Sequence, residues 1–224
     1  MKFSLIKHVM LDNFFIGIIN MNYILKSGYL LNLLIILFIF GLISKRKVII
    51  YVCLILFAFL LYFFRDINYK IPNNDNQLNS PCQGTVLKVI RKDGLIHIAI
   101  FLSPLDIHVQ YTPCKGKIIE QKYKEGEFNM AHLFEKSNYN ERMETTIYND
   151  MFGYVKIYQI AGLLARSIVS FYNVNDELEQ NVPFGLIRLG SRVDILLNDK
   201  PNYELALKEG DKVKIGDSLV INIT

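Results

Sequence analysis

Two long apolar runs in the first third of the chain constrain its fold most. The first extends from Gly28 to Ile43 and is interrupted only by Asn32, and the second extends from Val48 to Phe64. Each is near the lower length limit of a membrane-spanning helix, about 17 to 25 residues. As helices they would be apolar on every side, which disfavours a hairpin buried in a soluble core. The runs therefore predict a helical membrane hairpin over residues 28–64.

Basic residues flank both runs and bear on orientation. The loop Lys45-Arg46-Lys47 favours the cytoplasmic side, but Lys26 and Arg65 favour the same side for the opposite ends of the two runs. Two short helices that dip into one leaflet would keep all these charges on one side, and the depth of insertion stays open. We expect a membrane protein whose folded domain lies on the cytoplasmic face. Residues 1–27 contain an apolar patch and are expected to lie along the interface.

The pattern changes to β after a polar stretch. Residues 65–79 are expected to be a junction, because Asn73–Gln77 is a run of polar residues. From residue 80 onward, short Val- and Ile-rich runs are punctuated by Gly, Asp and Pro. The expected strands are 84–90, 95–102, 116–123, 154–160, 166–172, 192–197 and 218–224. These runs predict a mainly β domain over residues 80–224.

A short repeat lies within this region. Ser80–Val86 is echoed by Thr112–Ile118, each with a Pro-Cys-x-Gly sequence leading into an expected strand. Glu-Gly turns follow at 125–127 and 209–211. This arrangement resembles the barrel-sandwich domains of lipoyl and biotinyl carriers, although two similar turn-to-strand corners would also explain it. We expect a barrel-sandwich-like β domain.

Charge and cysteine content restrict the class of protein. The formal net charge is only +4, and basic residues alternate with acidic ones, which disfavours a nucleic-acid partner and suits an anionic membrane surface. Cys53, Cys82 and Cys114 show neither a disulfide framework nor zinc-ligand spacing, so we expect three free thiols. No metal site and no nucleotide-binding loop is expected.

A Gly-Ser pair near the C-terminus is the first candidate for chemistry. Gly190 and Ser191 stand between two apolar, strand-like runs. Glycine permits a close backbone approach, and a serine hydroxyl next to a carbonyl can attack it. Most such pairs are ordinary turns. The surrounding segment, FGLIRLGSRVDILL at 184–197, nevertheless resembles the processing segment of the phosphatidylserine decarboxylases, in particular their short bacterial and archaeal type.

The resemblance implies a proenzyme that cuts itself. In that family the serine attacks the preceding carbonyl, and the chain breaks between Gly190 and Ser191. Ser191 would become a pyruvoyl group, a self-generated cofactor, and fragments 1–190 and 191–224 would stay associated. The pyruvoyl carbonyl would form an imine with the amine of phosphatidylserine or a related seryl phospholipid. Loss of carbon dioxide would then give phosphatidylethanolamine, so the chain is expected to be a carboxy-lyase acting on a membrane phospholipid.

Further segments carry the same resemblance. Phe101–Pro113 is similar to the family's "FLSP.D.H….P" segment, and it makes His108 the expected proton donor, since histidine titrates in the required range. Phe63–Pro72 is similar to the junction that follows the membrane helix. Asn140–Arg142 and Gln159–Val169 are similar to the short family's "NER" and "QIAGL.AR.IV" segments.

Two arginines in or near these segments have alternative roles. Arg166 and Arg192 are either solvated surface charges or ligands of a lipid phosphate, for which a guanidinium fork is well shaped.

Two positions depart from the family pattern. Gln83 stands where the family usually has aspartate, and Tyr111 stands where larger members have a second histidine. Neither glutamine nor a phenol of ordinary pKa is an effective base at neutral pH. The alternative function is therefore an uncleaved, catalytically silent relative that binds lipid or a partner at the membrane. A lipoate or biotin carrier is disfavoured because Lys115 only partly imitates a modifiable lysine. A homo-oligomer is compatible with the sequence.

Overall fold

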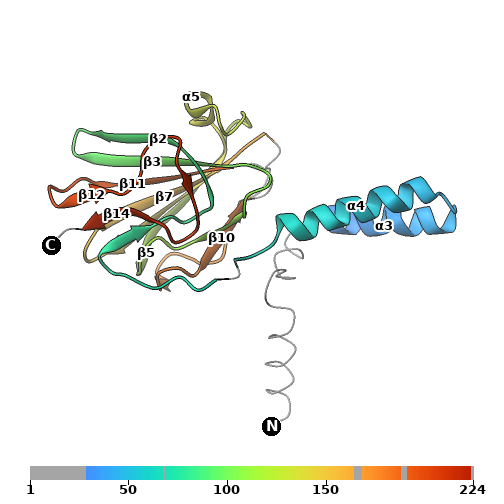
Figure 1. Cartoon of the computed structure of the whole chain (residues 1–224), viewed down its shortest axis with the longest axis horizontal. Helices are drawn as coiled ribbons and strands as arrows, with labels where there is room; N and C mark the ends of the chain where they lie inside the picture. The colour runs from blue at the N-terminus through green and yellow to red at the C-terminus, as the bar shows by residue number, and fades with distance from the viewer. Residues whose placement is uncertain (1–28, 68, 164–167, 188–190, 223–224) are drawn as a thin grey trace, which may run out of the picture. The chain divides into compact units, whose positions relative to one another are not determined.

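The computed structural model describes residues 29–67, 69–163, 168–187 and 191–222. The chain forms two compact units that divide between Tyr69 and Lys70, within the predicted junction. The first unit is helical and the second is mainly β (Figure 1). The end of the predicted junction is not a free linker, because Gln77–Asn79 forms strand β1 and buries Leu78 completely.

The described part of the first unit consists of two helices, as the apolar runs predicted. α3 (Tyr29–Ile43) and α4 (Lys47–Phe63) lie side by side and are joined by a tight turn (Figure 1). Lys45 adopts the left-handed conformation with φ 52°, and the Arg46 N–H donates to the Gly41 carbonyl at 3.0 Å. A Cβ atom on Gly41 would lie 3.1 Å from side-chain atoms of both Ile49 and Ile50, so this glycine allows the close approach.

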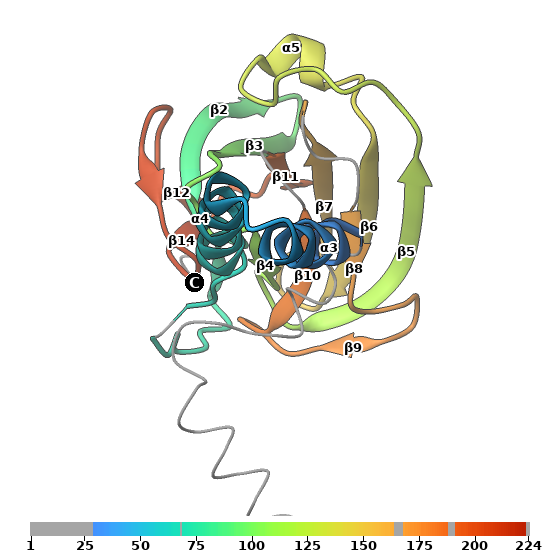
Figure 2. The same ribbon diagram turned by 90° about the vertical axis from the view of Figure 1, so that its right-hand side faces the viewer.

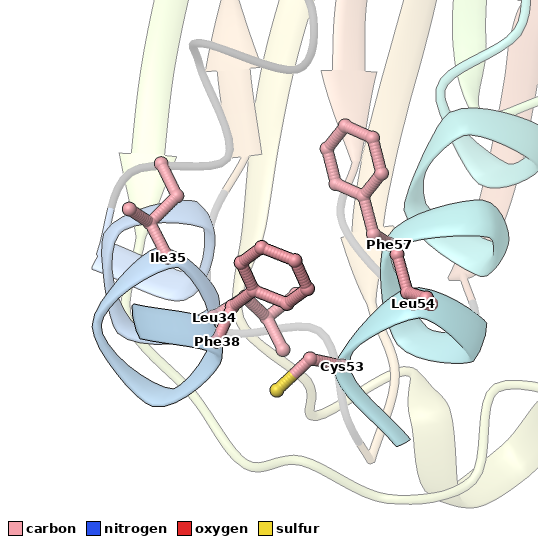
Figure 3. Close-up of a pocket in the computed structure, with 6 residues that line it drawn as sticks. All are labelled: Leu34, Ile35, Phe38, Cys53, Leu54 and Phe57. Carbon is pink, nitrogen blue, oxygen red and sulfur yellow. The ribbon is translucent and has the colours of Figure 1, made fainter. Parts of the chain in front are cut away.

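The helix pair presents apolar side chains both inward and outward. Between the helices is an apolar cavity of about 250 Å³ (Figure 3). It is lined by Leu34, Ile35, Phe38, Cys53, Leu54 and Phe57. On the outside, Ile43 is 77% exposed and Val48 is 75% exposed. Among the described residues, no helix combines the length and the apolar character required to cross a bilayer.

Three antiparallel sheets build the second unit. The largest has eight strands in the order β13 (Lys212–Val213), β2 (Gly84–Lys92), β3 (Leu95–Leu102), β11 (Ser191–Asn198), β7 (Gly153–Ala161), β6 (Arg142–Asn149), β5 (Gly116–Lys124) and β9 (Glu177–Leu178). One small sheet is β1, β14 (Ser218–Asn222) and β12 (Tyr203–Leu205). The other is β4 (Val109–Tyr111), β10 (Pro183–Ile187) and β8 (Ile168–Ser170). The prediction of a mainly β domain is confirmed.

The large sheet curves around the core. Figure 2 shows β2 on one side and β5 on the other, with β4, β10 and β8 lying across the open side. Alternation of side chains directs one face of each central strand inward, which buries Ile98 of β3, Ile157 of β7 and Ile195 of β11 completely. A short helix, α5 (Phe134–Ser137), lies in the connection between β5 and β6.

The sequence repeat marks two equivalent halves. In the large sheet, β2 is the second strand from one edge and β5 is the second strand from the other. A Cβ atom on Gly84 would lie 2.2 Å from the Phe101 carbonyl oxygen, and one on Gly116 would lie 2.2 Å from the Tyr148 carbonyl oxygen. The two copies are also linked by backbone hydrogen bonds, because each accepts one from the residue that precedes the other copy. The Asn79 N–H donates to the Pro113 carbonyl at 2.9 Å, and the Tyr111 N–H donates to the Pro81 carbonyl at 2.7 Å.

Candidate active site

Ser191 is the first residue of β11, at the middle of the large sheet. It lies opposite Leu102 of β3 and Ala161 of β7, and its side chain is fully buried. Its hydroxyl has no hydrogen-bond partner among the described residues. Buried hydroxyl groups are nearly always hydrogen-bonded, so this one is an exception among the described residues. Gly190, and with it the predicted cleavage bond, lies outside the described residues.

His108 follows β3 and is fully buried beside the strand that leads toward Ser191. Its Nδ1 lies 2.8 Å from the Asp106 carbonyl oxygen. Because a carbonyl oxygen only accepts, Nδ1 carries the hydrogen and Nε2 is the acceptor nitrogen of the neutral ring. The Ile187 N–H donates to the His108 carbonyl at 3.3 Å, four residues before Ser191. The backbone of His108 is therefore hydrogen-bonded to the segment that leads to the predicted cleavage point.

Gln83 contacts the carboxylate of Asp106, and the sequence did not predict this contact. Its Nε2 donates to Asp106 Oδ1 at 3.1 Å, and the Ser103 N–H donates to Asp106 Oδ2 at 2.8 Å. Both oxygens of Asp106 are thereby fixed, and its carbonyl orients His108. Tyr111, the second departure from the family pattern, is buried on β4 with 5% exposure.

A chain of amides extends from His108 into the core. The Gln110 side-chain NH₂ donates to the His108 carbonyl at 2.6 Å, and the Gln159 NH₂ donates to Gln110 Oε1 at 2.8 Å. Both glutamines are completely buried. A Cβ atom on Gly185 would lie 2.6 Å from Gln159 Nε2, so only glycine leaves room for this amide. One feature of the sequence is consistent with this network. Gln110 and Gln159 are each a glutamine on the buried face of a strand.

Comparison with known proteins identifies the family. Residues 56–221 match the family model described as "Phosphatidylserine decarboxylase". A phosphatidylserine decarboxylase proenzyme of Pelagibacter ubique is 39% identical over 177 residues, which covers 75% of this chain and 81% of that protein. The chain belongs to the phosphatidylserine decarboxylase family. The predicted resemblance is confirmed, and the protein is an enzyme, a carboxy-lyase.

Relatives from distant organisms show similar agreement. A putative archaetidylserine decarboxylase proenzyme of Methanosarcina barkeri is 36% identical and covers 77% of this decarboxylase and 81% of its own length. A phosphatidylserine decarboxylase proenzyme of Solibacter usitatus is 40% identical, with 72% and 78% covered. Among solved structures, the glucose permease IIA of Mycoplasma capricolum aligns with a TM-score of 0.41 and 16% identity, over 66% of this chain and 96% of that one.

Arg192 of the decarboxylase is a buried structural residue, contrary to the predicted phosphate-binding role. It is 1% exposed, and Nε and Nη2 donate to the two carboxylate oxygens of Asp194 at 2.8 and 2.9 Å. The remaining N–H groups donate to the Phe134 carbonyl, Ser137 Oγ and Asn138 Oδ1 at 2.8, 2.6 and 2.6 Å. All five donors are used, so none is available to a phosphate. Arg166 lies outside the described residues.

The other two described histidines flank this arginine cluster. His97 Nε2 lies 2.8 Å from Asp194 Oδ2, and its ring packs 5.7 Å from the ring of Phe134. His132 packs edge-on against Phe101 at 5.8 Å. His97, on β3, and His132, in the segment that flanks α5, thus lie where the sheet meets the α5 layer.

Proposed function

We propose that the chain is a proenzyme that cuts itself between Gly190 and Ser191 and then decarboxylates phosphatidylserine or a related seryl phospholipid. The observation that carries the proposal is the fully buried Ser191 hydroxyl at the start of the central strand, which has no hydrogen-bond partner in the described part of the chain. The relatives named above are described as proenzymes, and their names share a serine head group on different lipid backbones. The head group, and not the backbone, is therefore the proposed point of recognition.

The residues near Ser191 support the chemistry. A pyruvoyl group formed from Ser191 would supply an electron-withdrawing carbonyl for the loss of carbon dioxide. The Ser191 hydroxyl fits this origin, because no group among the described residues would lose a hydrogen bond on its conversion. His108 Nε2 accepts a proton when the ring is neutral, and once protonated it delivers a proton to the substrate carbon that has lost carbon dioxide. The product would be phosphatidylethanolamine.

The short fragment would remain in place after cleavage. Ser191–Asn198 lies between β3 and β7 and pairs with both over its length. Residues 191–222 also supply β14, which pairs with β1, and β13, which pairs with β2. The short fragment would therefore stay bound to the long one through the hydrogen bonds of β11, β13 and β14.

We also propose that α3 and α4 hold the enzyme at the membrane. Large apolar side chains such as Ile36 (62% exposed) and Ile55 (68% exposed) cover the outside of the helix pair. Such a surface is unfavourable in water and favourable among acyl chains. Insertion into one leaflet would keep the basic turn at Lys45-Arg46-Lys47 at the cytoplasmic surface. Ile36→Asp combined with Ile55→Asp should abolish flotation of the protein with phosphatidylglycerol vesicles.

The intact mass of the purified full-length protein tests the central proposal. We expect two chains divided between Gly190 and Ser191, with the short chain lighter by ammonia than a serine-terminated peptide. Ser191→Ala should give a single uncut chain without decarboxylase activity, whereas Ser218→Ala, on another strand, should be cut normally.

The same mass spectrum tests the alternative of a catalytically silent, lipid-binding relative. The contact that favours this alternative is the one between Gln83 and Asp106, because Gln83 supplies an amide donor where a base is expected. A single unbroken wild-type chain would establish the silent relative and refute self-cleavage.

A further inference from the structure

Three buried side-chain atoms without hydrogen-bond partners gather on one part of the large sheet. They are Ser191 Oγ, Gln159 Oε1 and Glu141 Oε1. In the described part of the chain only one other buried side-chain atom lacks a partner, Asn79 Oδ1 on β1. An unpartnered buried acceptor costs free energy unless a ligand or water satisfies it. Their grouping therefore indicates a place for a ligand.

The strand register puts the three side chains on the same face. Ser191 lies opposite Ala161, and the Ala161 N–H donates to the Glu141 carbonyl at 2.9 Å, so the three residues form one row across β11, β7 and β6. Gln159 is two residues before Ala161 and points to the same side. Only the methyl group of Ala161 separates Glu141 from Ser191 along the row. Two strand spacings place their backbones about 10 Å apart.

Hydrogen-bond directions fix Gln159 as an acceptor. The His108 carbonyl only accepts, so Gln110 must turn its NH₂ toward it and its oxygen toward Gln159. Gln159 in turn must give its NH₂ to that oxygen, which leaves its own Oε1 pointing away without a partner. The acceptor character of Gln159 Oε1 therefore follows from a chain that ends at a backbone carbonyl.

Glu141 adds a negative charge to this face. Burial, together with the Glu141 carboxylate, raises the pKa of Tyr123 to about 12. Tyr123 is therefore a neutral group beside this carboxylate at physiological pH. One charged and one neutral acceptor match a cation with several N–H donors, which is the chemistry of an ammonium group.

We propose that Glu141 and Gln159 bind the ammonium group of the seryl head group beside Ser191. The inference rests on the proposed function, because the substrate amine has to reach the carbon derived from Ser191. Glu141 Oε1 and Ser191 Oγ make no hydrogen bond to each other or to any other described residue, so both are available to a bound head group. Glu141 and Gln159 are thus positioning residues for the substrate.

Binding to the uncut Ser191→Ala protein tests this without decarboxylation. Calorimetric titration would compare dihexanoyl phosphatidylserine with dihexanoyl phosphatidic acid, which has no ammonium group. Glu141→Gln in this background should weaken phosphatidylserine binding about tenfold, the loss typical of a charge-assisted hydrogen bond, and leave phosphatidic acid unchanged. The matched control is Glu144→Gln, on the same strand but on the opposite face, where Glu144 pairs with Arg142 and Lys124. It should alter neither affinity.

Two results would overturn the proposal: unchanged phosphatidylserine affinity in Glu141→Gln, or equal weakening toward both lipids. If Glu141→Gln lacks a native thermal transition, Gln159→Met provides the same comparison, because it removes the acceptor and preserves the side-chain length. Failure of the proposed function is seen separately, as a wild-type chain that stays uncut or inactive. The binding comparison retains its meaning in that case, since it uses the uncut protein.

Discussion

The imidazole Nδ1 of His108 lies 2.8 Å from the backbone carbonyl oxygen of Asp106, two residues earlier in the chain. This contact fixes the tautomer of a completely buried histidine through a backbone carbonyl. The Asp106 side chain instead receives hydrogen bonds from Gln83 and from the Ser103 backbone, which hold the turn in shape. The aspartate therefore orients the histidine through its backbone, and its carboxylate supports the turn.

Replacement of His108 should separate maturation from catalysis. His108→Ala should still be cut at Ser191 but lose decarboxylation by a factor of about 100 or more, the usual contribution of a positioned general acid. Intact mass reports cleavage, and release of carbon dioxide from phosphatidylserine reports activity. His132→Ala removes a ring that contacts Phe101 and should retain both properties. An uncut His108→Ala chain would instead assign the histidine to self-cleavage.

The described residues include one buried and one exposed bidentate Arg–Asp pair, and replacement of the arginine should lower stability much more in the buried pair. Arg192 pairs with Asp194 inside the protein, and Arg91 pairs with Asp199 at the surface. Arg192→Met should lower the free energy of unfolding by about 3–5 kcal/mol, because it leaves a buried carboxylate without its guanidinium. Arg91→Met should have little effect, since solvent screens the exposed pair. Urea unfolding of both variants in the uncut Ser191→Ala background gives the comparison, and equal losses would contradict it.

The two repeat glycines should be intolerant of even a methyl group. Gly84→Ala should cost about 3 kcal/mol, because its Cβ would overlap a carbonyl oxygen of the neighbouring strand. Gly116→Ala should cost more, since Gly116 has the same overlap and also a φ of +151°. Gly94→Ala meets no atom within 4 Å and has only the strain of its φ of +74°, about 1–2 kcal/mol. In thermal unfolding of the uncut protein, Gly116→Ala should have the lowest midpoint, Gly84→Ala the next and Gly94→Ala the highest.

Glu144 should make stability depend on pH. Partial burial raises the pKa of its carboxyl, but hydrogen bonds and charges from Arg142 and Lys124 outweigh burial and lower the pKa below its usual value. A lowered pKa in the folded state gives stability above the ordinary glutamate range, which is lost as pH falls through the folded value. Glu144→Gln should therefore be less stable than its parent at neutral pH, and the difference should close on acidification to about pH 3. Urea midpoints across this range measure it, and a constant difference would exclude the linkage.

Regular apolar strands were predictable from sequence, and a polar one was not. The run at 95–102 coincides with β3, because its side chains are apolar at nearly every position. β6 was missed because threonine occupies its buried positions at Thr145 and Thr146, so its alternation is weak. Packing from the neighbouring strands decides its conformation.

The site was predictable where a local motif carried it. Ser191 and His108 were identified from contiguous segments that resemble the family. The contact of Gln83 with Asp106 and the pairing of Gln110 with Gln159 join residues 23 and 49 positions apart, and only the folded sheet brings them together. Arg192 was misread for the same reason, because Ser137, one of its partners in the α5 layer, lies 55 residues away.

The central place of β11 would have a consequence for a chain cut before Ser191. In the uncut chain this strand is continuous with the rest of the polypeptide, so it takes its place between β3 and β7 as part of a single folding polymer. After a cut before Ser191, the same strand would belong to a separate short peptide, for which re-entry into the middle of a sheet is a bimolecular event. Loss of structure would then be practically irreversible, and survival would be governed by the rate of unfolding. Such a molecule would keep a structure that could form only while the two fragments were still one chain.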